Sequence, residues 1–194
     1  MARNLFDPVN KALRRVPTWS VYLLGLLPLG WISYETLTGR IGVDPVRGIE
    51  WSLGLWALRW IGLNLIRFRR QIGLVAFGLV LLHFASWLTI DMGLRWGQIL
   101  ADLYKRWYIL IGMSALILLL PLALTSNAAA IRLLGSQAWS RLHKLVYPAA
   151  ILAVLHYSMV GKVYTTEMLT YAAILAGLLG WRLVKLGPKR LVLA

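Results

Sequence analysis

The chain has 194 residues, of which 59% are hydrophobic and 14% are charged, with a mean hydropathy of +0.68 and a formal net charge of +14. This composition is typical of a membrane protein, and it disfavours nucleic-acid binding because the Lys and Arg residues lie in short clusters between apolar runs. The absence of cysteine excludes disulfides, thiolate zinc sites, iron–sulfur clusters and covalently attached haem, so any metal must be bound by His, carboxylate or Met.

Six apolar segments are candidates to cross a bilayer core about 30 Å thick. The first follows Arg14 and Arg15 and lacks a clear small-residue cleavage site, so we interpret it as a retained anchor and not as a signal peptide. Helices satisfy every backbone group internally, and the sequence therefore predicts an all-α integral membrane protein with one domain over residues 1–194. The predicted spans of this bundle of about six transmembrane helices are residues 17–35, 50–66, 72–90, 107–124, 142–160 and 168–186.

The second of these spans is short. Only sixteen residues separate Glu50 from Arg67, which as a helix extend about 24 Å, and Arg59 lies among them. We retain the crossing because without it the basic stretch RFRRQ would lie outside and the orientation of the remaining chain would invert.

The distribution of charge predicts the orientation. If both termini and the loops near 67–71 and 125–141 face the cytoplasm, that side carries fourteen of the 21 Lys and Arg residues. Six of the seven acidic residues fall on the opposite side. The positive-inside rule therefore predicts cytoplasmic N and C termini, and it explains much of the basic charge as topology and contact with anionic membrane lipid.

The three histidines, His83, His143 and His156, all lie in or at the edge of predicted spans. One such imidazole is commonly a neutral hydrogen-bonding group between helices, but three of three favours metal ligation. His83 lies thirteen residues beyond Arg70 and His156 lies twelve beyond Lys144, so both are about 18 to 20 Å above their basic anchors. Two imidazoles at one depth predict a bis-histidine clamp of the kind that holds a b-type haem.

His143 is harder to assign. It lies about 20 Å below His156 and about 140° away around an ideal helix, so the two share a face only if Pro148 redirects the helix between them. Three roles stay open for His143: a metal ligand of a second haem with an unusual or missing partner, a contact to flavin or quinone, or a structural hydrogen bond.

Arg69 and Arg70 are the other candidate cofactor-binding residues. With Arg67 they form a topology anchor, and they are also suited to bind a flavin phosphate or a haem propionate because Arg pairs bidentately with such oxygens. Metalloprotease, nucleophile-elbow and P-loop motifs do not occur, and no pair of intramembrane carboxylates indicates a proton-driven carrier.

Several stretches of the sequence resemble a known family. They are GVDPVRGIE, NLIRFRRQIGL leading to LLHF, LALTSN, and WSRLHKLVY followed by LHY. The chain resembles the MsrQ family, formerly YedZ: the haem-binding membrane subunits of the bacterial periplasmic methionine sulfoxide reductase system, within the ferric-reductase-like transmembrane group. Compared with this family, a dozen or more residues are absent before NLIRFRR, which agrees with the short second span.

The resemblance implies haem b, FMN as a further cofactor, and His83, His143 and His156 as the haem-associated histidines. It also implies an inner-membrane subunit that passes electrons to a soluble periplasmic molybdopterin partner, MsrP, from the quinone pool or a flavin reductase. Without a Rossmann fingerprint or a soluble domain the chain is expected to relay electrons and not to be catalytic alone. The alternatives are a helical membrane protein without a redox cofactor, as a carrier or an assembly factor with structural histidines, and a haem-containing metal-ion reductase.

Overall fold

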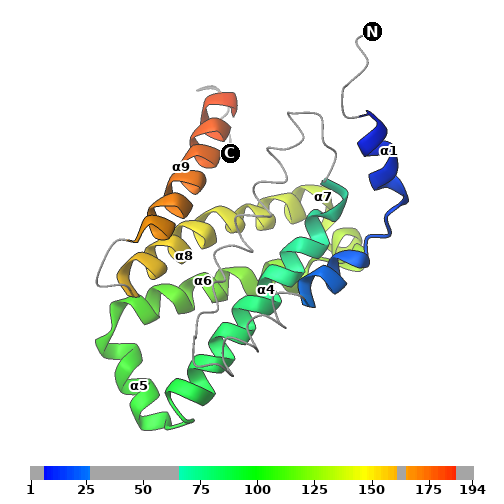
Figure 1. The fold of residues 1–194 in the computed structure, drawn as a ribbon. Coiled ribbons are helices and arrows are strands. Elements are labelled where there is room, and N and C mark those ends of the chain that lie inside the picture. Colours follow the sequence, from blue (N-terminus) through cyan, green and yellow to red (C-terminus); the bar gives the residue numbers. More distant parts are fainter. Residues whose placement is uncertain (1–6, 27–65, 161–164, 187–194) are drawn as a thin grey trace.

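The computed structural model describes residues 7–26, 66–160 and 165–186, and every regular element within these ranges is helical (Figure 1). This confirms the predicted all-α class. The predicted span over 50–66, the part of the first span beyond residue 26 and the stretch GVDPVRGIE lie outside the described residues, so the number of spans and the orientation stay predictions. The elements are α1 (Asp7–Arg15), a helical turn over 20–26, η2 (Ile66–Phe68), α4 (Arg69–Ser86), η3 (Trp87–Asp91), α5 (Trp96–Lys105), α6 (Trp107–Leu124), α7 (Ala128–Leu142), η4 (His143–Leu145), α8 (Val146–Val160) and α9 (Thr166–Leu186).

Within the described ranges, two helical segments are long and apolar enough to cross a membrane: Arg69–Asp91, which is α4 with η3, and α6. In the most apolar 18-residue stretch of each segment, only 11% of Arg69–Asp91 and 17% of α6 is buried within the described protein. The core helix of a soluble protein would be mostly buried, so this low burial favours a lipid-facing surface for both segments. The predicted spans 72–90 and 107–124 therefore correspond to helices of suitable length and surface.

The predicted helix over 142–160 is instead divided. Helix α7 ends at Leu142, residues 143–145 form a 3₁₀ turn, and α8 begins at Val146. Pro148 lies in the first turn of α8, where a missing N–H is tolerated, and not in the middle of a span. In a continuous α-helix its ring would clash with the carbonyl of Lys144, which explains why the chain changes to a 3₁₀ turn at that point.

The predicted loops on both sides of α6 contain helices that the sequence analysis missed. Helix α5 lies before α6, and α7 occupies most of the predicted loop 125–141. The Asn127 side chain caps α7 by accepting a hydrogen bond from the Ala130 N–H at 2.7 Å. Gly135 then breaks the regular helix with a φ of 75°, a conformation that favours glycine.

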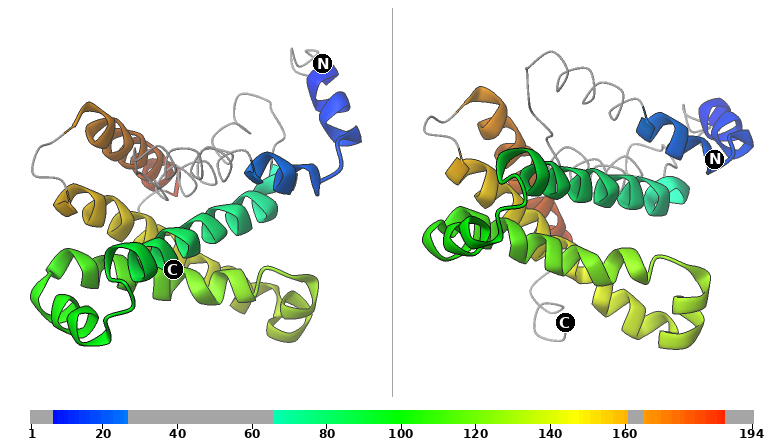
Figure 2. Two further views of the ribbon diagram at one scale, coloured as in Figure 1. Left: turned by 60° about the horizontal axis from the view of Figure 1, so that its bottom comes forward. Right: turned by 90° about the horizontal axis from the view of Figure 1, so that it is seen from below.

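The core lies between α6 and α8, which pack against each other more extensively than any other pair of the described helices. The face of α8 carries small buried side chains at Ala149, Ala150 and Ala153, which contact Leu119 and Leu122 of α6. Small residues let two helix backbones approach closely, as they do in membrane bundles. Helix α4 runs obliquely to this pair, and α9 packs against α8 from another side (Figures 1 and 2).

Candidate functional site

The structure brings His83 of α4 and His156 of α8 together. The centroids of their partly buried imidazole rings are 6.2 Å apart, with an angle of 74° between the ring planes. This is the pairing that the depth argument predicts, because two helices with the same rise place the two rings at one level. We call these residues the histidine pair.

His156 has a defined hydrogen-bonding partner. Its Nδ1 lies 2.7 Å from the backbone carbonyl oxygen of Tyr108, in the first turn of α6. A carbonyl only accepts hydrogen bonds, so Nδ1 carries the proton and donates it. In the neutral tautomer that this bond favours, the lone pair is on Nε2, the nitrogen through which a histidine held in this way binds a metal.

The His83 ring forms no hydrogen bond with the described part of the chain, whereas its backbone carbonyl accepts one from the Ser86 hydroxyl at 2.8 Å. Immediately after Ser86 the helix widens into the π-helical turn of η3. Such turns are rare and are frequently found at functional sites. Both imidazoles of the histidine pair thus have a nitrogen available to a ligand.

His143 lies in a different environment. Its ring stacks on the indole of Trp139 with centroids 3.8 Å apart, and its Nε2 lies 3.3 Å from Thr125 Oγ1. The single hydroxyl proton of Thr125 is donated to the carbonyl of Pro121 at 2.6 Å, so the hydroxyl accepts the Nε2–H of His143. The Trp139 indole N–H donates in turn to the Thr125 carbonyl at 2.9 Å.

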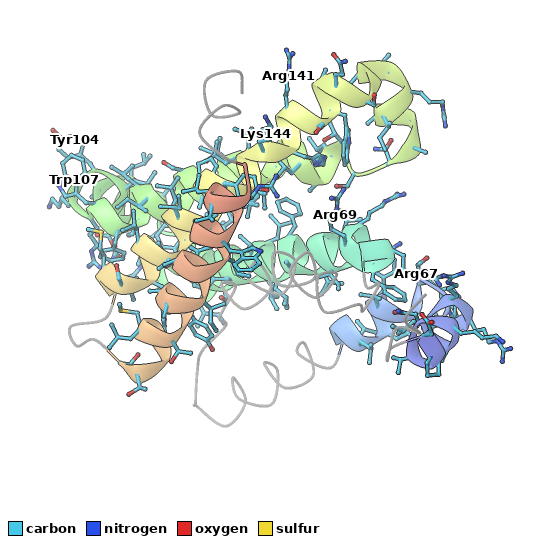
Figure 3. The ribbon with its side chains drawn as sticks, turned by 90° about the horizontal axis from the view of Figure 1, so that it is seen from above. Arg67, Arg69, Tyr104, Trp107, Arg141 and Lys144 are labelled. Carbon is cyan, nitrogen blue, oxygen red and sulfur yellow. The ribbon has the colours of Figure 1, made fainter. Side chains whose placement is uncertain are left out.

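A cavity of about 500 Å³ opens beside His143, within the size range of small-molecule sites. Its walls come from α4, α6, α7, η4, α8 and α9, and it contains both arginines that the sequence singled out. Figure 3 shows Arg69 of α4 and Lys144 of η4 at this part of the molecule, with Tyr104 and Trp107 at the far end. We call this cavity the basic pocket, and its charged or aromatic lining includes Arg69, Arg70, Trp139, His143, Lys144, Tyr147, Trp181 and Arg182.

Positive charge dominates the lining of the basic pocket. Arg69 interacts electrostatically with His143, and the guanidinium of Arg182 lies 4.7 Å above the ring centroid of Tyr147. Among the described residues, no acidic side chain lines the cavity. The pocket is therefore suited to an anionic ligand with phosphate or carboxylate groups, which Arg binds bidentately and Lys binds as a point charge.

The histidine pair and the basic pocket lie at opposite ends of α6. His156 bonds to Tyr108 in the first turn, and His143 contacts Thr125 at the C-cap, seventeen residues later. At 1.5 Å per residue these contacts are about 25 Å apart along the helix axis. The structure therefore does not bring His143 to the histidine pair.

Comparison with known proteins gives a consistent result. Residues 20–154 match the family described as the ferric reductase like transmembrane component. The chain is 46% identical over 180 residues to the protein-methionine-sulfoxide reductase heme-binding subunit MsrQ of Agrobacterium fabrum. The aligned region covers 86% of this chain and 83% of the relative. The chain belongs to the MsrQ family. Subunits of the same name from Brucella ovis and Brucella suis are 44% identical, over 86% of this chain and 81% of each relative.

No solved structure matches this chain. Several residues that build the histidine pair's surroundings and the basic pocket could not be identified from the sequence by looking for ligand-type side chains. Tyr108 contributes a backbone carbonyl, which any residue carries, and Trp139 is one of ten tryptophans in the chain. Arg182 could have been noticed as a cation within a predicted apolar span, but the residues it contacts are distant in the sequence.

Proposed function

We propose that this chain is a haem-bearing subunit of the bacterial inner membrane that relays electrons to a periplasmic molybdopterin methionine sulfoxide reductase. The observation that carries the proposal is the histidine pair on two helices of an apolar bundle. Membership of the MsrQ family supports it, since the relatives are named heme-binding subunits of protein-methionine-sulfoxide reductase.

The donor set of the histidine pair fits haem b. Neutral imidazoles are established axial ligands of haem iron. A ring separation of 6.2 Å is close to what two metal–imidazole bonds of about 2 Å each require, once the distance from nitrogen to ring centre is added on both sides. Bound at the pair, haem supplies a one-electron carrier that alternates between ferric and ferrous iron.

The roles of the protein groups follow from their contacts. His156 presents Nε2 because Tyr108 holds its Nδ1–H, and His83 supplies the second imidazole from α4. Within the described residues, neither side chain of the pair forms a salt bridge. The apolar surfaces of α4 and α6 favour a macrocycle within the lipid-facing bundle.

The basic pocket is a separate candidate site, for FMN. Its cations are suited to the phosphate of this cofactor, and Trp139 and Tyr147 offer aromatic surfaces for a ring system. Arg69 and Arg70 are the residues that we expect to bind the phosphate, and the positive-inside rule predicts that they face the cytoplasm. This location suits the entry of electrons from the quinone pool or a flavin reductase.

The two alternative functions have weaker support. A carrier or an assembly factor gives no reason for two imidazoles from distant segments to lie together, or for one of them to be held by a bond at Nδ1 that leaves Nε2 available. A haem-containing metal-ion reductase uses the same pair, and it differs only in the acceptor of the electrons.

Optical spectra test the proposal. We expect the full-length protein, purified in mild detergent after expression with ample haem, to show a Soret band that sharpens and shifts when dithionite is added. Reoxidation on mixing with the oxidised molybdopterin subunit, but not with ferric citrate, would favour the reductase partner over metal-ion reduction. A parent protein without a Soret band would contradict the proposal.

A further inference from the structure

The contact between His156 and Tyr108 uses a carbonyl that is already part of a helix. In α6 the Tyr108 carbonyl is the acceptor for the N–H of Gly112, four residues later. The 2.7 Å contact from His156 Nδ1 adds a second donor to the same oxygen. An imidazole can reach this oxygen only from the side of the helix, across the next turn, which is where Gly112 lies.

Gly112 has no side chain to obstruct that approach. A Cβ atom at this position would lie 2.8 Å from His156 Nδ1, 2.9 Å from Cε1 and 3.2 Å from Cγ. Carbon atoms of real side chains do not approach this closely, so the ring rests on the surface that the absent Cβ leaves open.

Four glycines of α4 and α9 differ from Gly112, whereas Gly25, in the helical turn over 20–26, is also closely packed: a Cβ there would lie 2.7 Å from Val75 Cγ1. A Cβ at Gly73, Gly78, Gly177 or Gly180 would meet no atom of the described protein within 4 Å. Glycine weakens the interior of a helix relative to alanine, and α6 has glycine at the one position where the imidazole of a proposed ligand requires the space.

We propose that Gly112 is a positioning residue for His156: its missing side chain lets the imidazole bond to the Tyr108 carbonyl, which keeps the proton on Nδ1 and directs Nε2 to the haem iron. The proposal rests on the proposed function, since it assigns a role toward the haem of the histidine pair. The hydrogen bond also makes the ring a more basic ligand, because a carbonyl that accepts the distal N–H increases the electron density on the other nitrogen.

The test compares Gly112→Ala with Gly177→Ala, a matched control in α9 that adds the same methyl group without a contact. Haem titration, potentiometry and electron paramagnetic resonance are carried out on both full-length variants and on the parent. In Gly112→Ala we expect a loss of haem affinity of about 10- to 100-fold, the range typical of outer-shell partners of metal ligands. We also expect a more positive midpoint potential and altered low-spin g values, because the ligand becomes less basic.

The control is expected to match the parent in all three measurements. A Gly112→Ala protein with the affinity, potential and g values of a haem-binding parent would overturn this inference alone. A parent that binds no haem would overturn the proposed function and this inference with it.

A second measurement applies even if Gly112→Ala does not fold. In the reduced, diamagnetic parent protein labelled with ¹⁵N in its histidine rings, we expect the His156 Nδ1 signal to be a proton-coupled doublet, assigned by its loss in His156→Ala. A proton on His156 Nε2 would overturn the inference. Nε2 would then have no lone pair for the iron, and Nδ1 would have no proton to donate to the Tyr108 carbonyl.

Discussion

The two ends of α6 present the same side chain in opposite ways. At the Tyr108 end, His156 donates its Nδ1–H to a carbonyl, which leaves Nε2 available, and the His83 ring lies close by. At the Thr125 end, His143 donates its Nε2–H to a hydroxyl and stacks on Trp139 beside a group of cations. The first arrangement is suited to axial ligation of a metal, and the second to one wall of an anion-binding pocket.

This difference shows that the hydrogen-bonding partner, and not the residue type, determines which ring nitrogen each histidine leaves available. Both rings are partly buried, and both are held by α6. Only at the Tyr108 end does a second imidazole lie close by. Along α6 the two sites are about 25 Å apart, so each can be altered without direct contact with the other.

The largest effect is expected from removal of the histidine pair. His83→Ala and His156→Ala each remove one of the two proposed haem ligands, and we expect haem content to fall to near background in both. His143→Ala is the matched control, since it removes a histidine from the other end of α6. A pyridine haemochrome assay on purified protein measures the content, and full retention of haem in both pair variants would contradict the ligand assignment.

A smaller effect is expected in the basic pocket. Arg69→Ala removes a lining guanidinium, and because a hydrogen bond to a charged group contributes about 1.5 to 3 kcal/mol, we expect FMN affinity to fall by roughly 10- to 150-fold. Arg141→Ala is the control, since Arg141 is an exposed arginine near the pocket that is not part of its lining. Fluorescence titration with FMN measures both, and equal losses in the two variants would indicate a general charge effect without a site.

The smallest effect is expected from Thr125→Val, which removes the hydroxyl that accepts the His143 Nε2–H. A neutral hydrogen bond contributes about 1 kcal/mol of free energy, so we expect its loss to change FMN affinity by no more than about fivefold. Haem content at the histidine pair should stay at the parent value. If Thr125→Val lowers haem content as strongly as His156→Ala does, the two ends of α6 are not independent.

Sequence reasoning succeeded where a single helix decides the outcome. Helix α6 begins and ends at the predicted residues because Arg106 and the polar residues after Leu124 bracket one continuous apolar run. The pairing of His83 with His156 was predictable for the same reason: the rise of a helix is fixed, so residues counted from a basic anchor give a depth.

It failed where contacts between elements decide. The stretch AAAIRLLGSQAWSRL appears as a loop because it lacks a long apolar run, yet it forms α7 with a break at Gly135. The contact of Gly112 with His156 depends on how α6 and α8 rotate against each other, which neither sequence segment encodes alone. The basic pocket likewise combines side chains from six elements. Of these side chains, only Arg69, Arg70 and His143 were candidate cofactor-binding residues from the sequence.

Electron paramagnetic resonance of the oxidised protein tests the central claim most directly, namely that the histidine pair and not His143 ligates the haem iron. We predict a low-spin ferric signal with bis-imidazole g values in the parent, the same signal in His143→Ala, and its loss in His156→Ala. A bis-imidazole signal that survives in His156→Ala, or one that disappears only in His143→Ala, would contradict the account.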